Sequence, residues 1–119
     1  MQTKTQTWVR ALSVAVAPLG VKRVKKLNGR VYEYVYIRLS TTMWPEVVDA
    51  YKIRLRMAPP DLSAPPVVVL IRRFQGGARS VAFDIPREYQ KLIREYARNG
   101  VIAVLDIEVV EKQPKAPRP

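Results

Sequence analysis

Residues 21–40 decide the fold, and they read VKRVKKLNGRVYEYVYIRLS. Two runs rich in β-branched and aromatic residues flank the dipeptide Asn28-Gly29, which is a strong short-range signal for a β-hairpin. A two-residue type I′ turn needs positive φ at both central positions, and asparagine and glycine tolerate that conformation. The stretch therefore predicts a hairpin that turns at Asn28-Gly29.

Alternation along the two strands divides their side chains between two faces of the hairpin. With a two-residue turn, Arg23 lies opposite Tyr34 and Lys25 lies opposite Tyr32. One face then combines cations with tyrosines, namely Arg23, Lys25, Arg30, Tyr32, Tyr34, Tyr36 and Arg38. The other face is apolar enough for a core and carries Val24, Val31, Val35, Ile37 and Leu39. Near the turn this face also carries Lys22, Lys26 and Glu33, so we expect that part of the hairpin to project into solvent.

The patterns beyond this hairpin predict an α+β fold with a mainly antiparallel sheet. Strands are expected over residues 52–57, 67–74, 79–85 and 101–111, and residues 75–78 turn a second hairpin. A short helix begins at Pro45 and ends near Tyr51, and a long helix covers residues 86–98 and ends before Asn99-Gly100. The order hairpin, helix, strand occurs at residues 21–57 and again at 67–111. It indicates either two ββαβ pseudo-repeats or the chance recurrence of a common motif.

We expect a single domain over residues 1–111, with a proline-rich connection at 58–66 and a flexible basic tail at 112–119. The first strand is predicted at residues 5–17, closed by Pro18 and Gly20. Residues 1–20 also resemble a weak secretory signal, but their apolar core is short and a strand explains the same residues. A soluble, cytoplasmic protein without a membrane span is therefore expected, and its many prolines and arginines suit a thermophile.

Composition excludes several chemistries. The 119 residues contain no cysteine and no histidine, which excludes disulfides, thiol catalysis, Ser-His nucleophile pairs and zinc, haem or iron–sulfur sites. Twenty-one Lys and Arg against ten Asp and Glu give a formal net charge of +11 and a pI near 10.4. This charge favours either a polyanionic ligand or a basic module that binds an acidic protein. We expect no cofactor.

The predicted helix over residues 86–98 is amphipathic. One face, which we expect to pack on the sheet, carries Tyr89, Leu92, Ile93, Tyr96 and Ala97. The opposite face carries a basic ridge made of Arg87, Lys91, Arg94 and Arg98. Like charges at these spacings repel by about a few tenths of a kcal/mol per pair, so the ridge suggests contacts with phosphates or with an acidic partner. The alternative is a solvated face on a basic protein.

Two further rows of charge lie on predicted strands. Lys52, Arg54 and Arg56 alternate with apolar residues and form a third basic row. Asp106 and Glu108 share one face of the last strand, and two such carboxylates can hold magnesium in a nuclease. Charge alternation near a strand end explains them as well, so we predict no enzyme and no metal site.

The cations and tyrosines of the hairpin suggest a small, non-enzymatic nucleic-acid-binding protein of a DNA-binding or regulatory type. A two-stranded ribbon fits the major groove of a duplex, and tyrosine rings can stack on unpaired bases. Two structural interpretations stay open: cation–π pairs that stabilise an exposed sheet face, and a helix that covers the tyrosines. The alternative function is an accessory protein-interaction module of an intracellular assembly. Its basic surface would meet an acidic partner, and the long strands at either end would offer edges for pairing.

One stretch resembles a known family. Residues 81–88 read VAFDIPRE and resemble the strand–Ile-Pro–basic–Glu–helix signature of AbrB-like (SpoVT/AbrB) transcription regulators. Residues 36–39 (YIRL), followed by Trp44-Pro45-Glu46, show a weaker similarity to the same signature. The resemblance implies a swapped-hairpin barrel, a homodimer, and DNA binding through basic loops and strand residues. The Gly-Asp turn and the hairpin that follow the signature in that family are missing here, so no family contact residue is assigned to this chain.

Overall fold

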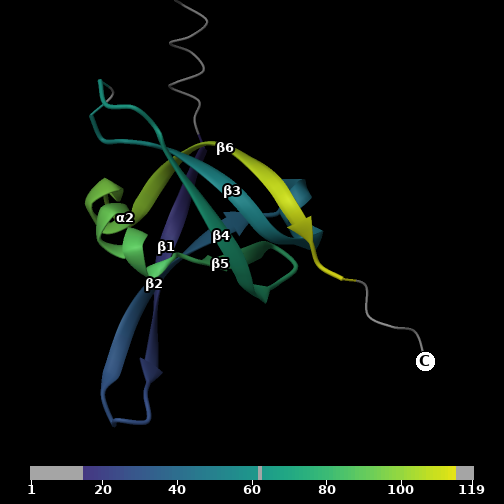
Figure 1. Ribbon diagram of the computed structural model, residues 1–119. Helices are drawn as coiled ribbons and strands as arrows, with labels where there is room; N and C mark the ends of the chain where they lie inside the picture. The colour runs from purple at the N-terminus through teal and green to yellow at the C-terminus, as the bar shows by residue number, and fades with distance from the viewer. Residues whose placement is uncertain (1–14, 62, 115–119) are drawn as a thin grey trace, which may run out of the picture.

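The chain forms a closed barrel, and apolar residues that alternate along its strands line the inside. The computed structural model describes residues 15–61 and 63–114. The six strands are β1 (Ala15–Lys25), β2 (Val31–Ser40), β3 (Ala50–Ala58), β4 (Val67–Gly76), β5 (Ser80–Asp84) and β6 (Val101–Lys112). They follow one another around the barrel in the order β1-β2-β5-β4-β3-β6, and every neighbouring pair is antiparallel (Figure 1). The predicted α+β fold with a mainly antiparallel sheet is confirmed at this level.

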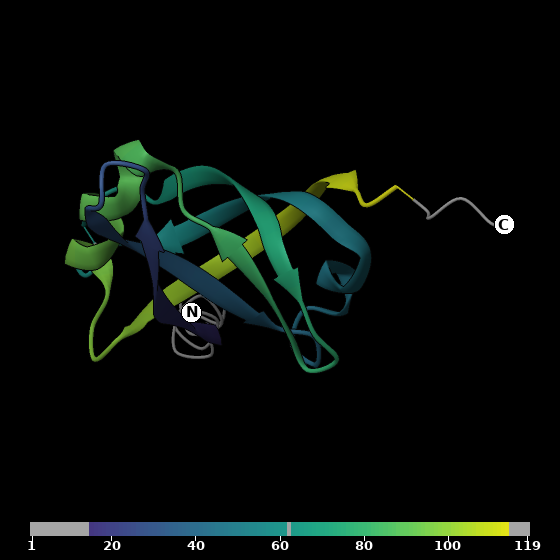
Figure 2. The ribbon, with the colours of Figure 1, turned by 90° about the horizontal axis from the view of Figure 1, so that it is seen from below.

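Two short helical segments close the ends of the barrel. The 3₁₀ helix η1 (Pro45–Asp49) joins β2 to β3, and the 3₁₀ turn η2 (Arg87–Tyr89) leads into the helix α2 (Gln90–Tyr96) between β5 and β6. Seen from below, α2 lies at the left end of the barrel and η1 at the right end (Figure 2). Each contributes a fully buried side chain, Val47 from η1 and Ile93 from α2. Both ends of the core are therefore covered by local segments.

The core consists of the side chains that point into the barrel. Ile37, Leu39, Ile53, Leu55 and Ile71 are all fully buried, and each alternates along its strand with more exposed residues. Removing such a set from water is the dominant favourable term in folding, at about 25 cal/mol per Å² of apolar surface. No polar or charged residue is buried within the described ranges.

The predicted long helix is wrong in its length. In place of one helix over residues 86–98, the chain forms η2 and then seven residues of α2. Ala97 is already extended, with φ −73° and ψ 135°. Asn99 and Gly100 then adopt positive φ values of 54° and 77°, and Arg98 pairs with Val101 across them. This tight turn ends the helix early, because the chain must reverse within four residues to enter β6.

The predicted break after the first strand is also wrong, because β1 continues through Pro18 and Gly20. Residues 15–18 pair with β6, whereas residues 19–25 pair with β2, so Pro18 lies where β1 changes partner. A proline, which has no N–H to donate, is tolerated at such an end of a ladder.

Some predicted segments lie outside the described ranges. They are residues 5–14 of the predicted first strand, residues 1–14 of the segment that resembles a secretory signal, and the last five residues of the predicted tail. Within that tail, Lys112 still belongs to β6, and Gln113 donates a hydrogen bond to the carbonyl oxygen of Asp49.

The hairpin of β1 and β2 turns through three residues, not through the predicted two. The N–H of Lys26 donates to the carbonyl of Arg30 (2.9 Å), and the N–H of Gly29 donates to the carbonyl of Lys26 (3.0 Å). Gly29 has a φ of 82°, as expected when a type I turn is followed by a left-handed residue. The additional loop residue shifts the register by one, so Lys22 lies opposite Tyr34, and Arg23 lies opposite Glu33.

A side-chain amide extends the sheet where β5 ends. The backbone pairing of β2 with β5 covers only residues 36–40 of β2, so Val35 has no strand beside it on that edge. Gln90 of α2 takes this place: its Oε1 accepts from the N–H of Val35 (2.7 Å), and its Nε2 donates to the carbonyl of Val35 (3.0 Å). The same Nε2 donates to the carbonyl of Ile85 (2.8 Å). Gln90 therefore holds α2 against the edge of β2.

We expect Gln90→Ala to lower the free energy of unfolding by about 1–3 kcal/mol, because three partly buried backbone groups lose their partner. Gln90→Glu should be destabilising too, since its carboxylate would face the carbonyl oxygens of Val35 and Ile85. Chemical denaturation measures both effects. Gln75→Ala is the control, because the exposed Gln75 side chain makes no hydrogen bond among the described residues. Equal midpoints for the alanine variants at positions 75 and 90 would contradict this role.

Candidate functional site

The hairpin projects from the barrel wall next to α2. Residues 21–25 of β1 and 31–35 of β2 pair with each other, while β5 and β6 pair only with later or earlier parts of these strands. We call these two segments the ribbon. Figure 1 shows it below the barrel, with α2 above it on the same side. The predicted projection of the hairpin is therefore confirmed, and α2 lies beside the ribbon at the level of Val35.

Two hollows lie between the ribbon and the segment that contains α2. The first, of about 360 Å³, is lined by Tyr32, Glu33, Tyr34, Arg87, Gln90, Lys91 and Arg94. The second, of about 320 Å³, is lined by Lys22, Val24, Lys26, Tyr34, Asp84, Ile85 and Arg87. Tyr34 and Arg87 belong to both linings, so the hollows are neighbours along one groove. We call this the ribbon–helix groove.

The groove unites the two surfaces that the sequence suggested separately. Tyr32 and Tyr34 are half-buried, so part of each ring remains accessible beside α2. Arg87, Lys91 and Arg94 are exposed along the rim. A tyrosine pair flanked by cations can accept a planar ring against its apolar surface while cations bind an attached anion.

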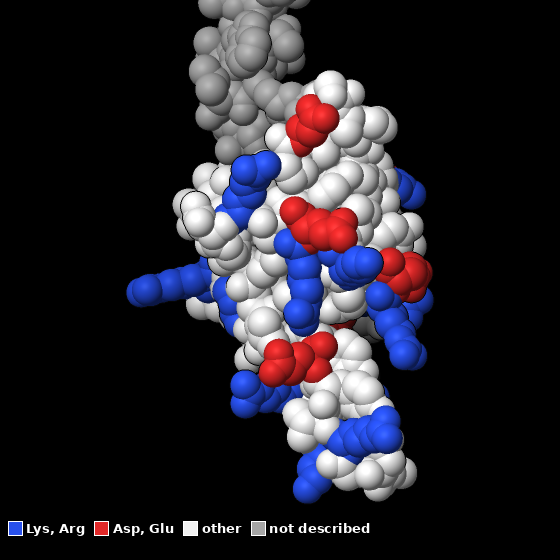
Figure 3. All heavy atoms as spheres, turned by 90° about the vertical axis from the view of Figure 1, so that its left-hand side faces the viewer, with Lys and Arg blue, Asp and Glu red and all other residues white. Residues whose placement is uncertain are grey.

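Ion pairing leaves this end of the molecule with an excess of positive charge. Carboxylates neutralise cations on the far wall, where Lys52, Arg54 and Arg56 of β3 pair with Glu111 (3.6 Å), Glu108 (2.5 Å) and Asp106 (3.3 Å) of β6. The predicted third basic row is therefore neutralised. On the ribbon and around α2, several cations make no ion pair with any described residue, namely Lys25, Lys26, Arg30, Arg87, Lys91, Arg94 and Arg98. Figure 3 views this end and shows Lys and Arg on the ribbon and on the body above it, with some acidic side chains among them.

Arg23 and Lys25 do not lie with the tyrosines, which corrects the predicted face of the hairpin. The shifted register places Lys22, Val24 and Lys26 beside them instead. Arg23 pairs with Glu33 at 3.3 Å on the opposite face. Lys26, by contrast, holds its ammonium 5.8 Å from the centre of the Tyr34 ring. Lys22 and Lys26 are therefore the cations of the hairpin that line the groove, whereas Arg30 lies near the tip and lines neither hollow.

Tyr36 and Arg38 are engaged in a separate cluster on the outside of the barrel. The Tyr36 ring meets Phe74 edge-on, with centroids 5.0 Å apart and an interplanar angle of 75°. Arg38 donates to the hydroxyl oxygens of Ser80 (3.1 Å) and Tyr36 (3.4 Å). An added Cβ on Gly20 would lie 2.2 Å from the Tyr36 ring, so the ring packs directly over this glycine. These two predicted site residues therefore belong to the packing of the barrel and line neither hollow.

Arg98 is separated from the predicted basic ridge because it lies beyond α2, in the turn that enters β6. The ridge therefore consists of Arg87, Lys91 and Arg94. The predicted apolar face of this segment is confirmed in part: Ile93 is fully buried, and Tyr89 and Ala97 pack against the core. Leu92 and Tyr96 are half-buried.

Sequence reasoning missed Lys22, Lys26 and Gln90 as residues of the groove. The two lysines were assigned to the wrong face because Asn28-Gly29 predicts a two-residue turn, and the loop has three. Asn28 accepts a hydrogen bond from the N–H of Arg30 (2.9 Å), which stabilises the longer loop. No sequence pattern marks Gln90, because its role depends on where β5 ends next to β2.

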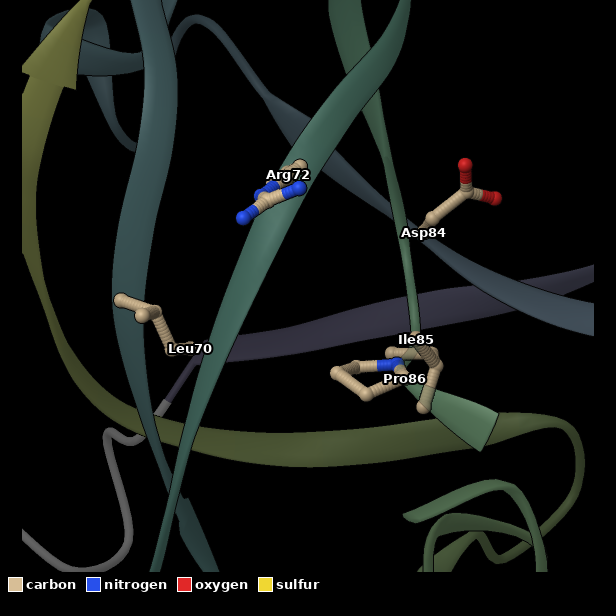
Figure 4. A pocket seen from close by; sticks show the side chains of 5 residues that line it. All are labelled: Leu70, Arg72, Asp84, Ile85 and Pro86. Atoms are coloured by element: carbon tan, nitrogen blue, oxygen red, sulfur yellow. The ribbon is translucent and has the colours of Figure 1, made fainter. Parts of the chain in front are cut away.

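The two carboxylates that the sequence suggested for catalysis, Asp106 and Glu108, are held by cations, and so is Asp84. Asp106 and Glu108 pair with arginines of β3, and Asp84 pairs with Lys22 at 2.5 Å. Asp84 also lines a third hollow of about 340 Å³ together with Leu70, Arg72, Ile85 and Pro86 (Figure 4). No cluster of three or more potential metal-ligating residues occurs among residues 15–61 and 63–114.

No protein-family model, curated protein or solved structure matches this chain. Among the described residues, no helix has the length and apolar character needed to cross a membrane.

We expect Gly20→Ala to lower the free energy of unfolding by about 1–3 kcal/mol, because the new methyl group displaces the Tyr36 ring from its contact with Phe74. In a Tyr36→Ala background the same change should have almost no cost, since no ring remains to be displaced. A double-mutant cycle in urea measures the coupling. Additive effects of the two substitutions would show that the close approach carries no energy.

Proposed function

We propose that this chain is a small, non-enzymatic nucleic-acid-binding protein and that the ribbon–helix groove is its binding surface. One observation carries the proposal: Tyr34 lies between two hollows whose linings include cations without an acidic partner among the described residues. Phosphates would bind the cations, and a base would stack on tyrosine. Of the residues singled out in the sequence, Tyr32, Tyr34, Arg87, Lys91 and Arg94 remain the proposed contacts, and Lys26 joins them.

The uneven charge distribution supports a polyanionic ligand. The wall formed by β3 and β6 pairs its cations with carboxylates, whereas Lys25 of the ribbon, Lys26 and Arg30 of its loop, and Lys91 and Arg94 of α2 make no ion pair with any described residue. Placing like charges side by side costs free energy unless a ligand neutralises them. Each phosphate that binds releases condensed counterions, so the affinity falls as salt concentration rises.

We expect the affinity for DNA to fall linearly on a log–log plot against salt concentration, and Arg94→Gln to reduce the slope by about 1. Fluorescence anisotropy with a labelled oligonucleotide measures both. The matched control is Arg79→Gln, which removes one exposed arginine from the turn between β4 and β5 at the other end of the barrel. Equal effects of the two substitutions, or binding only at about millimolar concentration at physiological salt, would contradict the proposed function.

A protein-interaction module remains the second candidate because part of the ribbon is apolar and exposed. Val21 and Val31 are 54% and 57% exposed, and Leu27 at the tip is fully exposed. Such side chains suit contact with a protein better than contact with phosphates. The terminal strands lend this candidate less support than the sequence suggested, since β1 and β6 pair with each other over residues 15–18 of β1.

We also infer that the two halves of the chain are ββαβ pseudo-repeats. Exchanging β1 with β4, β2 with β5 and β3 with β6 leaves the set of neighbouring strands unchanged. The helical segments η1 and α2 then occupy equivalent places, one at each end of the barrel. This exchange symmetry supports the repeat, although the two segments differ in length. The relation to AbrB-like regulators and the cytoplasmic location stay predictions.

A further inference from the structure

The geometry points to an unpaired, single-stranded nucleic acid as the ligand of the ribbon–helix groove, with one base against Tyr34 in the first hollow and its phosphate at Arg87. This inference rests on the proposed function and narrows its ligand. Neither base identity nor sequence preference is part of it.

Tyr34 offers one open side to a base. Lys26 lies over the Tyr34 ring at 5.8 Å from its centre and lines the second hollow, whereas it does not line the first. The first hollow has Tyr32 as a second ring and the exposed Lys91 and Arg94 at its rim. A base that enters there meets apolar ring surface, and stacking on an aromatic side chain does not depend on which base it is.

Arg87 provides the link between the two hollows. Its exposed side chain lines both of them, next to Tyr34. A nucleic-acid chain that places a base in the first hollow would pass Arg87 on its way to the second, where Lys22 and Lys26 lie. Lys22 is held by Asp84, which leaves Arg87 and Lys26 to bind the backbone phosphates.

The attachment of α2 disfavours a duplex. A ribbon that enters a major groove must present its face without obstruction. Here Gln90 holds α2 against the edge of β2 through hydrogen bonds of 2.7 and 3.0 Å to Val35, so the tyrosines lie in a groove and not on a free face. A paired base would have to leave its stack to reach Tyr34, which costs about a few kcal/mol. An unpaired base reaches it without that cost.

Anisotropy with three labelled probes of about 15 nucleotides tests this: single-stranded oligothymidylate, a duplex, and a fully abasic strand that keeps the phosphates. We expect the thymidylate to bind about 5–150-fold more tightly than the abasic strand, which is the fold-change that one stacked base supplies. It should also bind more tightly than the duplex. The abasic strand isolates the contribution of the cations from that of Tyr34.

Variants at Tyr34 assign the base contact. Tyr34→Leu should bind thymidylate no better than it binds the abasic strand, whereas Tyr34→Phe, which keeps the ring, should retain the preference. Tyr51→Leu is the control, since Tyr51 is a half-buried tyrosine of β3 that lines neither hollow. Thermal melting checks that each variant is folded, and Tyr34→Met, which also lacks the ring, replaces the leucine variant if that variant unfolds.

The outcomes separate the inference from the proposed function. Equal affinity for thymidylate and duplex, an unchanged preference in folded Tyr34→Leu, or loss of the preference in folded Tyr34→Phe would overturn the single-strand inference and leave nucleic-acid binding intact. Failure of the wild-type protein to bind any of the three probes would overturn both. A preference for thymidylate that disappears only in Tyr34→Leu supports the assignment.

Discussion

The pairing of β1 with β6 over residues 15–18 of β1 closes the barrel, and the position of the groove depends on it. Closure removes the open edges that an antiparallel sheet would otherwise present. Because only the first part of β1 takes part, the rest of the strand is free to leave the barrel wall with β2. The ribbon is therefore a direct result of how β1 divides its length between two partners.

Charge is distributed by the same strand pairings. The β3–β6 ladder brings three cations opposite three carboxylates, so that wall contributes little to the net charge. Exposed pairs of this kind contribute about 0–1 kcal/mol each to stability, so their main effect here is to decide where positive charge remains. Most of the described cations that make no ion pair lie at the end of the barrel that carries the ribbon and α2, which is where a polyanion would be attracted.

The groove depends on a helix of only seven residues that two side chains attach to the barrel. Ile93 anchors α2 in the core, and Gln90 replaces the missing strand beside Val35. Two contacts of different kinds, one apolar and one hydrogen-bonded, thus set the distance between α2 and the ribbon. That distance allows Tyr32 and Tyr34 to remain half-buried, and it separates them from Tyr36, which packs over Gly20 in the barrel wall.

Local patterns along the chain predict the antiparallel strands, the hairpin around Asn28-Gly29, the core-facing side of α2 and the strongly basic character. All of these depend on local periodicity, turn residues or composition, which can be read along the chain. The register of the hairpin, the early end of the helix and the role of Gln90 became visible only in the folded chain, as did the neutralisation of Lys52, Arg54 and Arg56. These depend on the geometry of a three-residue loop and on contacts between strands far apart in sequence. A shift of one residue exchanges the faces of a strand, so local patterns alone could not place Lys22 and Lys26 beside the tyrosines.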